Sequence, residues 1–146
     1  KSDAARQMEN LIALPGLTLE SASVRSDLII EASETLIANG TPGTARMMLE
    51  AGLADMPESF DLLVAHAAVL TLLQDWPVLK ITSQSILGVK PNVAAGWHYR
   101  ALARLSLGDL ETAASDIRQA QILAPEDIEV LLLRGRILDA QRTIRS

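Results

Sequence analysis

The spacing of three prolines constrains the fold of this chain more than any other feature of its sequence. Pro57, Pro91 and Pro125 follow one another at intervals of 34 residues. A fixed period of this length is typical of repeat architectures, in which other positions recur as well. We therefore divide the chain into windows of 34 residues that begin at residues 26, 60, 94 and 128, so that each of these prolines falls at window position 32.

Residues of similar size recur at fixed positions of these windows. Window position 4 holds a large apolar residue and window position 8 a small one: Ile29 and Ser33, Leu63 and Ala67, Trp97 and Ala101, and Leu131 and Gly135. Positions 4, 8 and 11 lie on one face of a helix because they are spaced by four and three residues, and positions 20, 24 and 27 form the same stripe on a second helix. Each window therefore predicts two helices, and the small residue at position 8 lets them pack closely.

Residues that favour turns and helix ends fall between the predicted helices. Gly40 and Gly108 occupy window position 15, where helices commonly end with a glycine in the left-handed conformation. Thr41 and Asp109 follow them and are expected to cap the second helix with their side chains. The middle window has no glycine at this position. The proline at window position 32 disfavours helical geometry in the residue before it and so ends the second helix.

The composition supports packed helices and excludes several classes of site. Aromatic residues make up only 3% of the chain, whereas sandwiches and barrels need aromatic and β-branched residues in their strands. The absence of cysteine excludes disulfides, thiolate zinc sites and iron–sulfur clusters, but it leaves the compartment open, cytoplasmic or periplasmic. The net charge of −5 argues against a nucleic-acid partner. Because no uncharged apolar run of about 18 residues is present, we expect a soluble chain without membrane insertion.

One window resembles a known repeat family. Its residues at the repeated positions match a tetratricopeptide (TPR) repeat: Trp97, Ala101, Gly108, Ala113, Ile117, Ala120 and Pro125. The resemblance, with weaker copies in the flanking windows, covers residues 26–146. It implies an all-α fold, a right-handed superhelical array of antiparallel helix pairs with a concave groove that binds peptide segments. Arg100 and Arg104 depart from the family pattern, because they stand where it usually has an apolar and an aromatic residue.

The window boundaries predict the domain organisation. Three TPR-like repeats are expected over residues 26–59, 60–93 and 94–127, followed by a C-terminal capping helix over residues 128–146. Residues 1–25 are out of register with the repeats, and their helical spacing predicts an N-terminal capping helix and linker, or alternatively a segment that occupies the groove. The chain begins at Lys1 without a methionine or a leader, which is consistent with a piece of a longer protein.

The sequence offers no recognisable reaction centre. Its two histidines, His66 and His98, lack the neighbouring ligands that a metal site requires. His66 falls at a packing position and is expected to be buried and hydrogen-bonded. Neither a nucleotide-binding glycine loop nor a nucleophile elbow is present. We therefore predict that the chain is not an enzyme and uses no cofactor and no metal.

The TPR resemblance implies that the first helix of each repeat forms the concave wall, chiefly at window positions 2, 5, 9 and 12. Twelve residues at these positions are the predicted partner-binding residues: Asp27, Ile30, Glu34, Asp61, Val64, Ala68, His98, Leu102, Leu105, Glu129, Leu132 and Arg136. They combine an apolar centre with a rim of carboxylates and lack the Lys, Arg and Asn clamp with which the family holds the terminal carboxylate of a peptide. We therefore expect a protein or peptide partner that is amphipathic and carries basic residues.

These features predict a non-catalytic protein–protein interaction module, a scaffold or chaperone-like adaptor. Two alternatives stay open. The apolar inner face can pair with a second copy of the chain, so homo-oligomerisation is the second hypothesis, and the TPR arm of a larger enzyme is the third. The apolar residues Ile30, Leu102 and Leu132 also fit a purely structural role, in which they pack on neighbouring helices.

Overall fold

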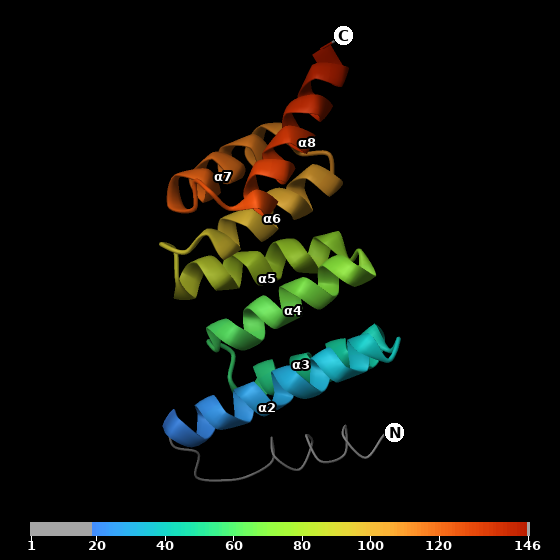
Figure 1. Ribbon diagram of the computed structural model, residues 1–146, viewed down its shortest axis with the longest axis vertical. Coiled ribbons are helices and arrows are strands. Elements are labelled where there is room, and N and C mark those ends of the chain that lie inside the picture. The colour runs from blue at the N-terminus through green and yellow to red at the C-terminus, as the bar shows by residue number, and fades with distance from the viewer. Residues whose placement is uncertain (1–18, 146) are drawn as a thin grey trace. The chain divides into compact units, whose positions relative to one another are not determined.

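The computed structural model describes residues 19–145, which are helical apart from short turns (Figure 1). The helices are α2 (Leu19–Ala38), α3 (Pro42–Asp55), α4 (Phe60–Leu73), α5 (Trp76–Val89), α6 (Ala94–Ser106), α7 (Leu110–Leu123) and α8 (Ile128–Arg145). No strand occurs among these residues, so the prediction of an all-α fold is confirmed. None of the described helices is both long and apolar enough to span a bilayer. The capping helix predicted near the N-terminus lies outside the described residues.

The helices begin and end at the same window positions in successive windows. α4, α6 and α8 begin at Phe60, Ala94 and Ile128, the first residues of their windows. α3, α5 and α7 each end two residues before a proline. The residues that precede these prolines, Met56, Lys90 and Ala124, have φ of −129°, −138° and −142° and ψ of 69°, 81° and 71°. Because proline disfavours helical geometry in its predecessor, each of these residues ends the second helix of its window.

The first described helix is longer than predicted. α2 begins at Leu19, so residues 19–25 are helical and do not belong to the predicted linker. Nothing in this stretch interrupts a helix, since the next glycine or proline after Gly16 is Gly40. The side chain of Arg25 is buried and pairs with Asp55 of α3. This ion pair anchors the early part of α2 to the helix that follows it.

Three turns place a residue in the left-handed conformation at window position 15. Gly40 and Gly108 have φ of 82° and 87°, and Gln74 has φ of 58° at the equivalent position of the middle window. A residue with a Cβ is strained in this region by roughly 1–2 kcal/mol, whereas glycine is not. The middle window therefore keeps the geometry of the turn without glycine, at a cost in free energy.

Replacing Gln74 with glycine is expected to stabilise the chain by roughly 1 kcal/mol, because the strain at φ of 58° is removed. The greater freedom of glycine in the unfolded chain offsets part of this gain. Urea unfolding followed by circular dichroism measures the effect. The matched control is Gln84→Gly at an exposed position inside α5, which is expected to destabilise by about 1 kcal/mol. A Gln74→Gly variant as unstable as the control would contradict the prediction.

The predicted side-chain caps of the second helices are wrong at two positions. Thr41 and Asp109 precede α3 and α7, but their side chains accept no hydrogen bond from these helices. The Thr41 hydroxyl instead donates to the carbonyl of Leu36 at 2.9 Å, because the last carbonyls of α2 have no helical donor left. The backbone carbonyl of Asp109 accepts from the Thr112 hydroxyl at 3.3 Å. The Thr41 side chain thus forms a hydrogen bond with a carbonyl at the end of α2 and none with the backbone N–H groups at the start of α3.

The chain divides between Gln74 and Asp75 into two compact units. In unit 1, α2, α3 and α4 share a core cluster of buried side chains: Ile29, Ala32, Leu36, Ala45, Met48, Leu49, Leu62 and Val69. A Cβ at Gly52 of α3 would lie 3.1 Å from Cδ1 of Ile29 and 3.3 Å from Cδ1 of Leu62. The missing side chain at Gly52 therefore lets α3 approach both neighbouring helices.

Unit 2 contains α5, α6, α7 and α8, each of which packs against the next (Figure 1). Its buried apolar residues are Leu79, Ile86, Ala101, Leu102, Ala103, Ala113, Ile117, Ala120, Val130, Leu133 and Ile137. A Cβ at Gly96 of α6 would lie 2.8 Å from Cγ of Leu87, so α5 and α6 approach closely at this point. Small and aliphatic side chains therefore fill the core of this unit.

Candidate partner-binding surface

The twelve predicted partner-binding residues lie on α2, α4, α6 and α8, the first helices of their windows. In unit 1, four of them are exposed, Asp27, Glu34, Asp61 and Ala68, and two are half-buried, Ile30 and Val64. Ile30 packs against the core cluster of unit 1, so it has a structural role as well. Because α2 and α4 contact each other, unit 1 combines the carboxylates of both helices with these two apolar side chains.

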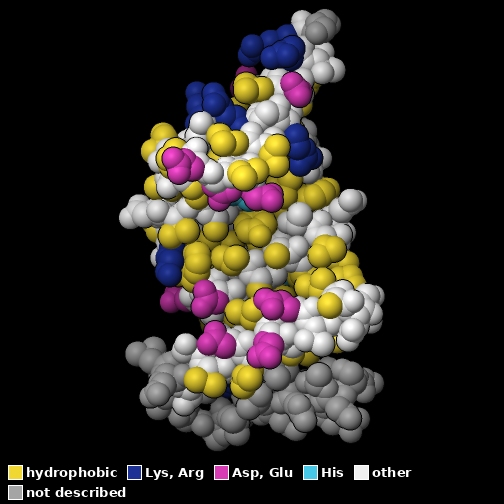
Figure 2. All heavy atoms as spheres, in the orientation of Figure 1, with side chains coloured by type: hydrophobic (Ala, Val, Ile, Leu, Met, Phe, Trp, Pro, Cys, Tyr) yellow, Lys and Arg dark blue, Asp and Glu magenta, His cyan; other side chains and the backbone are white. Residues whose placement is uncertain are grey.

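Unit 1 exposes more carboxylates than the predicted set contains. Five acidic side chains on α2 and around the start of α4 are exposed, and we call them the acidic face: Asp27, Glu31, Glu34, Glu58 and Asp61. Figure 2 shows acidic side chains gathered over these two helices. Glu31 and Glu58 were not predicted, because they lie outside window positions 2, 5, 9 and 12. The sequence signal that identifies them is that both acidic residues lie within a few residues of predicted carboxylates.

The arginines described in unit 1 are held by other carboxylates. Arg25 is buried and pairs with Asp55. Arg46 pairs with Glu50, with Nε at 3.1 Å from Oε2. The acidic face therefore carries an excess of negative charge, which attracts cationic groups and repels anionic ones.

His66 is packed inside unit 1, as expected from its window position. Its side chain is buried, and its Nε2 lies 3.0 Å from Oε2 of Glu50. Glu50 thus connects Arg46 on its own helix with His66 on α4. Over residues 19–145, no group of three or more acidic or histidine side chains is arranged to hold a metal ion.

The predicted residues of unit 2 divide between surface and core. Three residues of α8 are exposed, Glu129, Leu132 and Arg136, and two residues of α6 are half-buried, His98 and Leu105. Leu102 is only 8% exposed, so little of its side chain is open to a partner. The reason is that α6 contacts α5, α7 and α8, which leaves little of its surface free. Leu102 belongs to the buried residues of the unit.

The half-buried polar rings of α6 carry no charge at neutral pH. Burial lowers the pKa of His98, and the nearby carboxylates of Asp127 and Glu129 oppose this by raising it. Burial raises the pKa of Tyr99, and Glu129 raises it further. The two rings meet edge to face, with centroids 5.4 Å apart. His98 therefore adds no cation to the predicted surface at pH 7.

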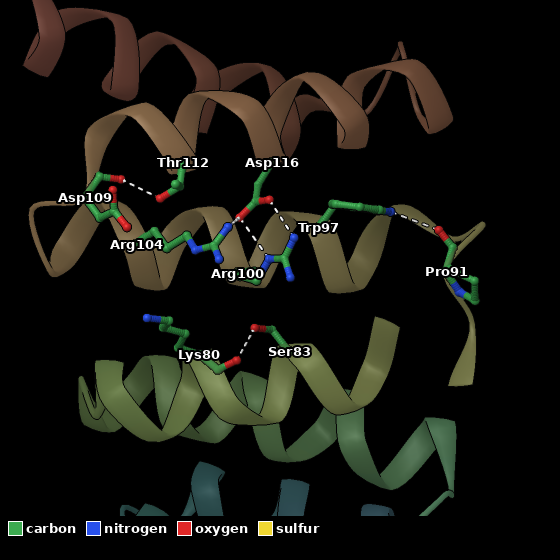
Figure 3. Close-up of polar contacts among 9 residues, drawn as sticks. All are labelled: Lys80, Ser83, Pro91, Trp97, Arg100, Arg104, Asp109, Thr112 and Asp116. Carbon is green, nitrogen blue, oxygen red and sulfur yellow. Dashed lines mark hydrogen bonds and ion pairs between the residues drawn. The ribbon is translucent and has the colours of Figure 1, made fainter. Parts of the chain in front are cut away.

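A buried ion-pair cluster in unit 2 was not predicted. The Asp116 side chain of α7 accepts hydrogen bonds from Arg100 Nε at 3.1 Å, Arg100 Nη2 at 2.9 Å and Arg104 Nη1 at 2.8 Å (Figure 3). The Arg100 guanidinium also lies 5.2 Å from the centre of the Trp97 ring. The signal in the sequence is the two arginines at packing positions, because a buried charge requires a partner of opposite charge. The cluster joins α6 to α7 and has a structural role.

Comparison with known proteins finds structural neighbours. No family model and no curated protein matches the chain. The first TPR domain of human RPAP3 has a TM-score of 0.74 at 19% identity, covering 81% of this chain and 93% of that one. The first TPR of Spaghetti (RPAP3), bound to the HSP90 peptide SRMEEVD, has a TM-score of 0.73 at 19% identity, covering 80% of this chain and 93% of that one. MamA from Desulfovibrio magneticus RS-1 has a TM-score of 0.65 at 15% identity, covering 99% of each chain. At these identities the likeness shows a common fold.

Proposed function

We propose that this chain, which has the tetratricopeptide-repeat fold, is a non-catalytic protein–protein interaction module. In this proposal, the acidic face of unit 1 binds a basic, amphipathic peptide segment, with the half-buried Ile30 and Val64 as apolar contacts. The observation that carries the proposal is the uncompensated charge: five exposed carboxylates lie in a unit whose described arginines pair elsewhere. A structural neighbour that holds a peptide supports this use of the fold.

The charge of unit 1 favours a different ligand from the peptide that Spaghetti holds. That peptide, SRMEEVD, contains three acidic residues and one arginine. The exposed carboxylates of the acidic face would repel it, whereas lysine and arginine side chains would form charge-assisted hydrogen bonds with them. Complementary charge also speeds association. We therefore propose a partner segment in which leucine-type anchors alternate with basic residues.

Unit 2 carries its own predicted partner-binding residues, and these have charges of both signs. Glu129 and Arg136 on α8 are exposed and oppositely charged, and Leu132 between them is exposed as well. His98 and Leu105 on α6 are half-buried. Because their charges balance, these residues would orient a partner more than attract it.

Reversing two charges of the acidic face is expected to weaken binding by at least about tenfold, mainly through a slower association rate. The variant is Asp27→Lys with Asp61→Lys, and the probe is a synthetic peptide of alternating leucine and lysine pairs. Both side chains are exposed, so the fold should be retained, which circular dichroism checks. Surface plasmon resonance at two salt concentrations measures the rates, because screening by salt reduces the contribution of exposed charges.

The matched control is Glu111→Lys with Glu126→Lys, which changes the net charge equally at exposed positions of unit 2. Glu111, like Asp61, lies in the first turn of a helix, so the two variants carry similar helix penalties. The control is expected to bind the peptide within about twofold of the unmodified chain. Equal weakening by both variants, or none by the first, would refute the acidic face as the binding site. The peptide SRMEEVD should not bind the unmodified chain.

A further inference from the structure

The packing stripe of the first helices is exposed on α8. In α2 and α4 the residues at window positions 4, 8 and 11 are buried: Ile29, Ser33, Leu36, Leu63, Ala67 and Leu70. We call the equivalent residues of the last window, Leu131, Gly135 and Leu138, the α8 stripe. Leu131 is 42% exposed, Leu138 is 45% exposed, and Gly135 is exposed as well. The opposite side of α8 supplies Val130, Leu133 and Ile137 to the buried core.

A comparison with unit 1 shows what the α8 stripe lacks. There, Ile29 and Leu36 of α2 share a cluster with Ala45, Met48 and Leu49 of α3, the second helix of the same window. No second helix follows α8 among the described residues. The α8 stripe is therefore an apolar packing face without its usual helical partner in the described chain.

Gly135 is a second indication that a helix packs here. Nothing lies within 4 Å of the place where its Cβ would be, so no contact within the described chain requires a glycine. A glycine inside a helix is less favourable than alanine. Small residues at the centre of an apolar stripe allow two helix backbones to approach closely. Gly135 therefore fits a helix that crosses α8 at this point.

The charges on the same face of α8 favour an antiparallel partner. Leu131, Leu138 and Arg142 are spaced by seven and four residues within α8, which places them on one side of the helix, and Asp127 directly precedes the helix. The pattern is symmetric about the point between residues 134 and 135. Asp127 and Arg142 are both exposed, and Figure 2 shows basic side chains gathered over the C-terminal part of α8. In an antiparallel pair of α8 helices, Asp127 of each copy faces Arg142 of the other, and Leu131 faces Leu138.

We propose that a second copy of this chain covers the α8 stripe, with the two α8 helices antiparallel and crossing between residues 134 and 135, next to Gly135. The charge pattern favours a second copy as the partner, because the acidic residue at the start of each α8 helix then meets the basic residue near the end of the other. The antiparallel arrangement also places the positive end of one helix dipole beside the negative end of the other. This surface is separate from the acidic face, so the proposal does not depend on the proposed peptide binding.

Sedimentation equilibrium of the 146-residue chain from micromolar to millimolar concentration tests whether the dimer exists. We expect a reversible dimer. Gly135→Leu should weaken it by more than about tenfold, because the added side chain separates the two backbones. The matched control is Gly88→Leu, at an exposed helical glycine of α5 that also has open space around it. A chain that stays monomeric at all concentrations, or a dimer that Gly135→Leu leaves unchanged, would overturn the proposal.

A charge exchange tests the antiparallel register. Asp127→Lys and Arg142→Glu should each weaken self-association, because each homodimer then contains two like-charge contacts. Mixing the two variants should restore pairing, because the introduced lysine faces the introduced glutamate and the native Arg142 faces the native Asp127. Native mass spectrometry of differently tagged variants then shows mostly mixed dimers, whereas a statistical mixture would refute this register. Asp127 also caps α8 by accepting the backbone N–H of Glu129 at 2.9 Å, so circular dichroism must confirm that the variant helices are intact.

Binding of the leucine–lysine peptide separates this proposal from the proposed function. Gly135→Leu should leave peptide affinity unchanged while it abolishes the dimer. The Asp27→Lys and Asp61→Lys variant should lose the peptide and still dimerise. If a helix of another protein covers the α8 stripe instead, this chain should be monomeric at every concentration tested. That result would overturn the proposed pairing of two copies.

Discussion

Replacing Asp116 with alanine is expected to destabilise unit 2 by about 3–5 kcal/mol, because it leaves two arginines without their carboxylate. Asp116 is 2% exposed, and the side chains of Arg100 and Arg104 are mostly buried, so water cannot replace the lost hydrogen bonds fully. Urea unfolding followed by circular dichroism measures the change in free energy. A loss below about 1 kcal/mol would show that the cluster is solvated and adds little.

Two further variants separate charge from packing in this cluster. Asp116→Asn keeps the shape of the side chain but removes the charge, and it should cost nearly as much as the alanine variant. Replacing Asp116, Arg100 and Arg104 together with leucine should restore most of the stability or exceed it, because apolar groups of similar volume often replace a buried ion pair without loss. If the triple variant were as unstable as Asp116→Ala, the cluster would be essential for packing and not only for charge balance.

Replacing Ile29 with alanine is the second large effect that we expect, at about 2–5 kcal/mol. Ile29 is fully buried in the core cluster of unit 1, and its Cδ1 lies against the backbone of α3 at Gly52. The alanine variant leaves a cavity between α2 and α3. The control is Leu28→Ala at the adjacent half-buried position, for which the loss should be clearly smaller. Equal losses at both positions would contradict the burial pattern of α2.

Gly52 allows the same cavity to be tested from the other side. In the unmodified chain, Gly52→Ala gains helix propensity but crowds Cδ1 of Ile29, which lies 3.1 Å from the new Cβ. In the Ile29→Ala background that crowding is gone, so Gly52→Ala should stabilise more there, by at least about 0.5 kcal/mol. A double-mutant cycle measures this coupling. No coupling between the two positions would mean that α2 and α3 do not meet here.

The helix boundaries could be predicted because the signals for them are local. The prolines at window position 32 act on the residue next to them, and Gly40 and Gly108 act on their own backbone. The start of α2 was wrong for the opposite reason. The first window begins at residue 26, seven residues after the start of α2, and Arg25 is held by Asp55, thirty residues away in the chain.

The surface was less predictable than the fold. Window positions identify which face of a helix a residue occupies, but not how much of that face a neighbour covers, so Leu102 was assigned to a groove although it is buried. The Asp116 cluster could not be predicted from the recurring apolar positions, because they do not show which charged side chains of α6 and α7 face one another. The carboxylates of Asp27 and Asp61 at window position 2, by contrast, are exposed, as the sequence predicted.

The prolines that end α3, α5 and α7 also bear on how the chain is synthesised. The windows that begin at residues 60 and 94 contain the residues that begin and end both of their helices, so each helical hairpin can close once its residues have left the ribosome. The described helices do not need contacts with residues far away in the sequence to form a hairpin, and the loops between successive helices are short. Growth from the N-terminus can therefore add helix to helix in the order of the sequence.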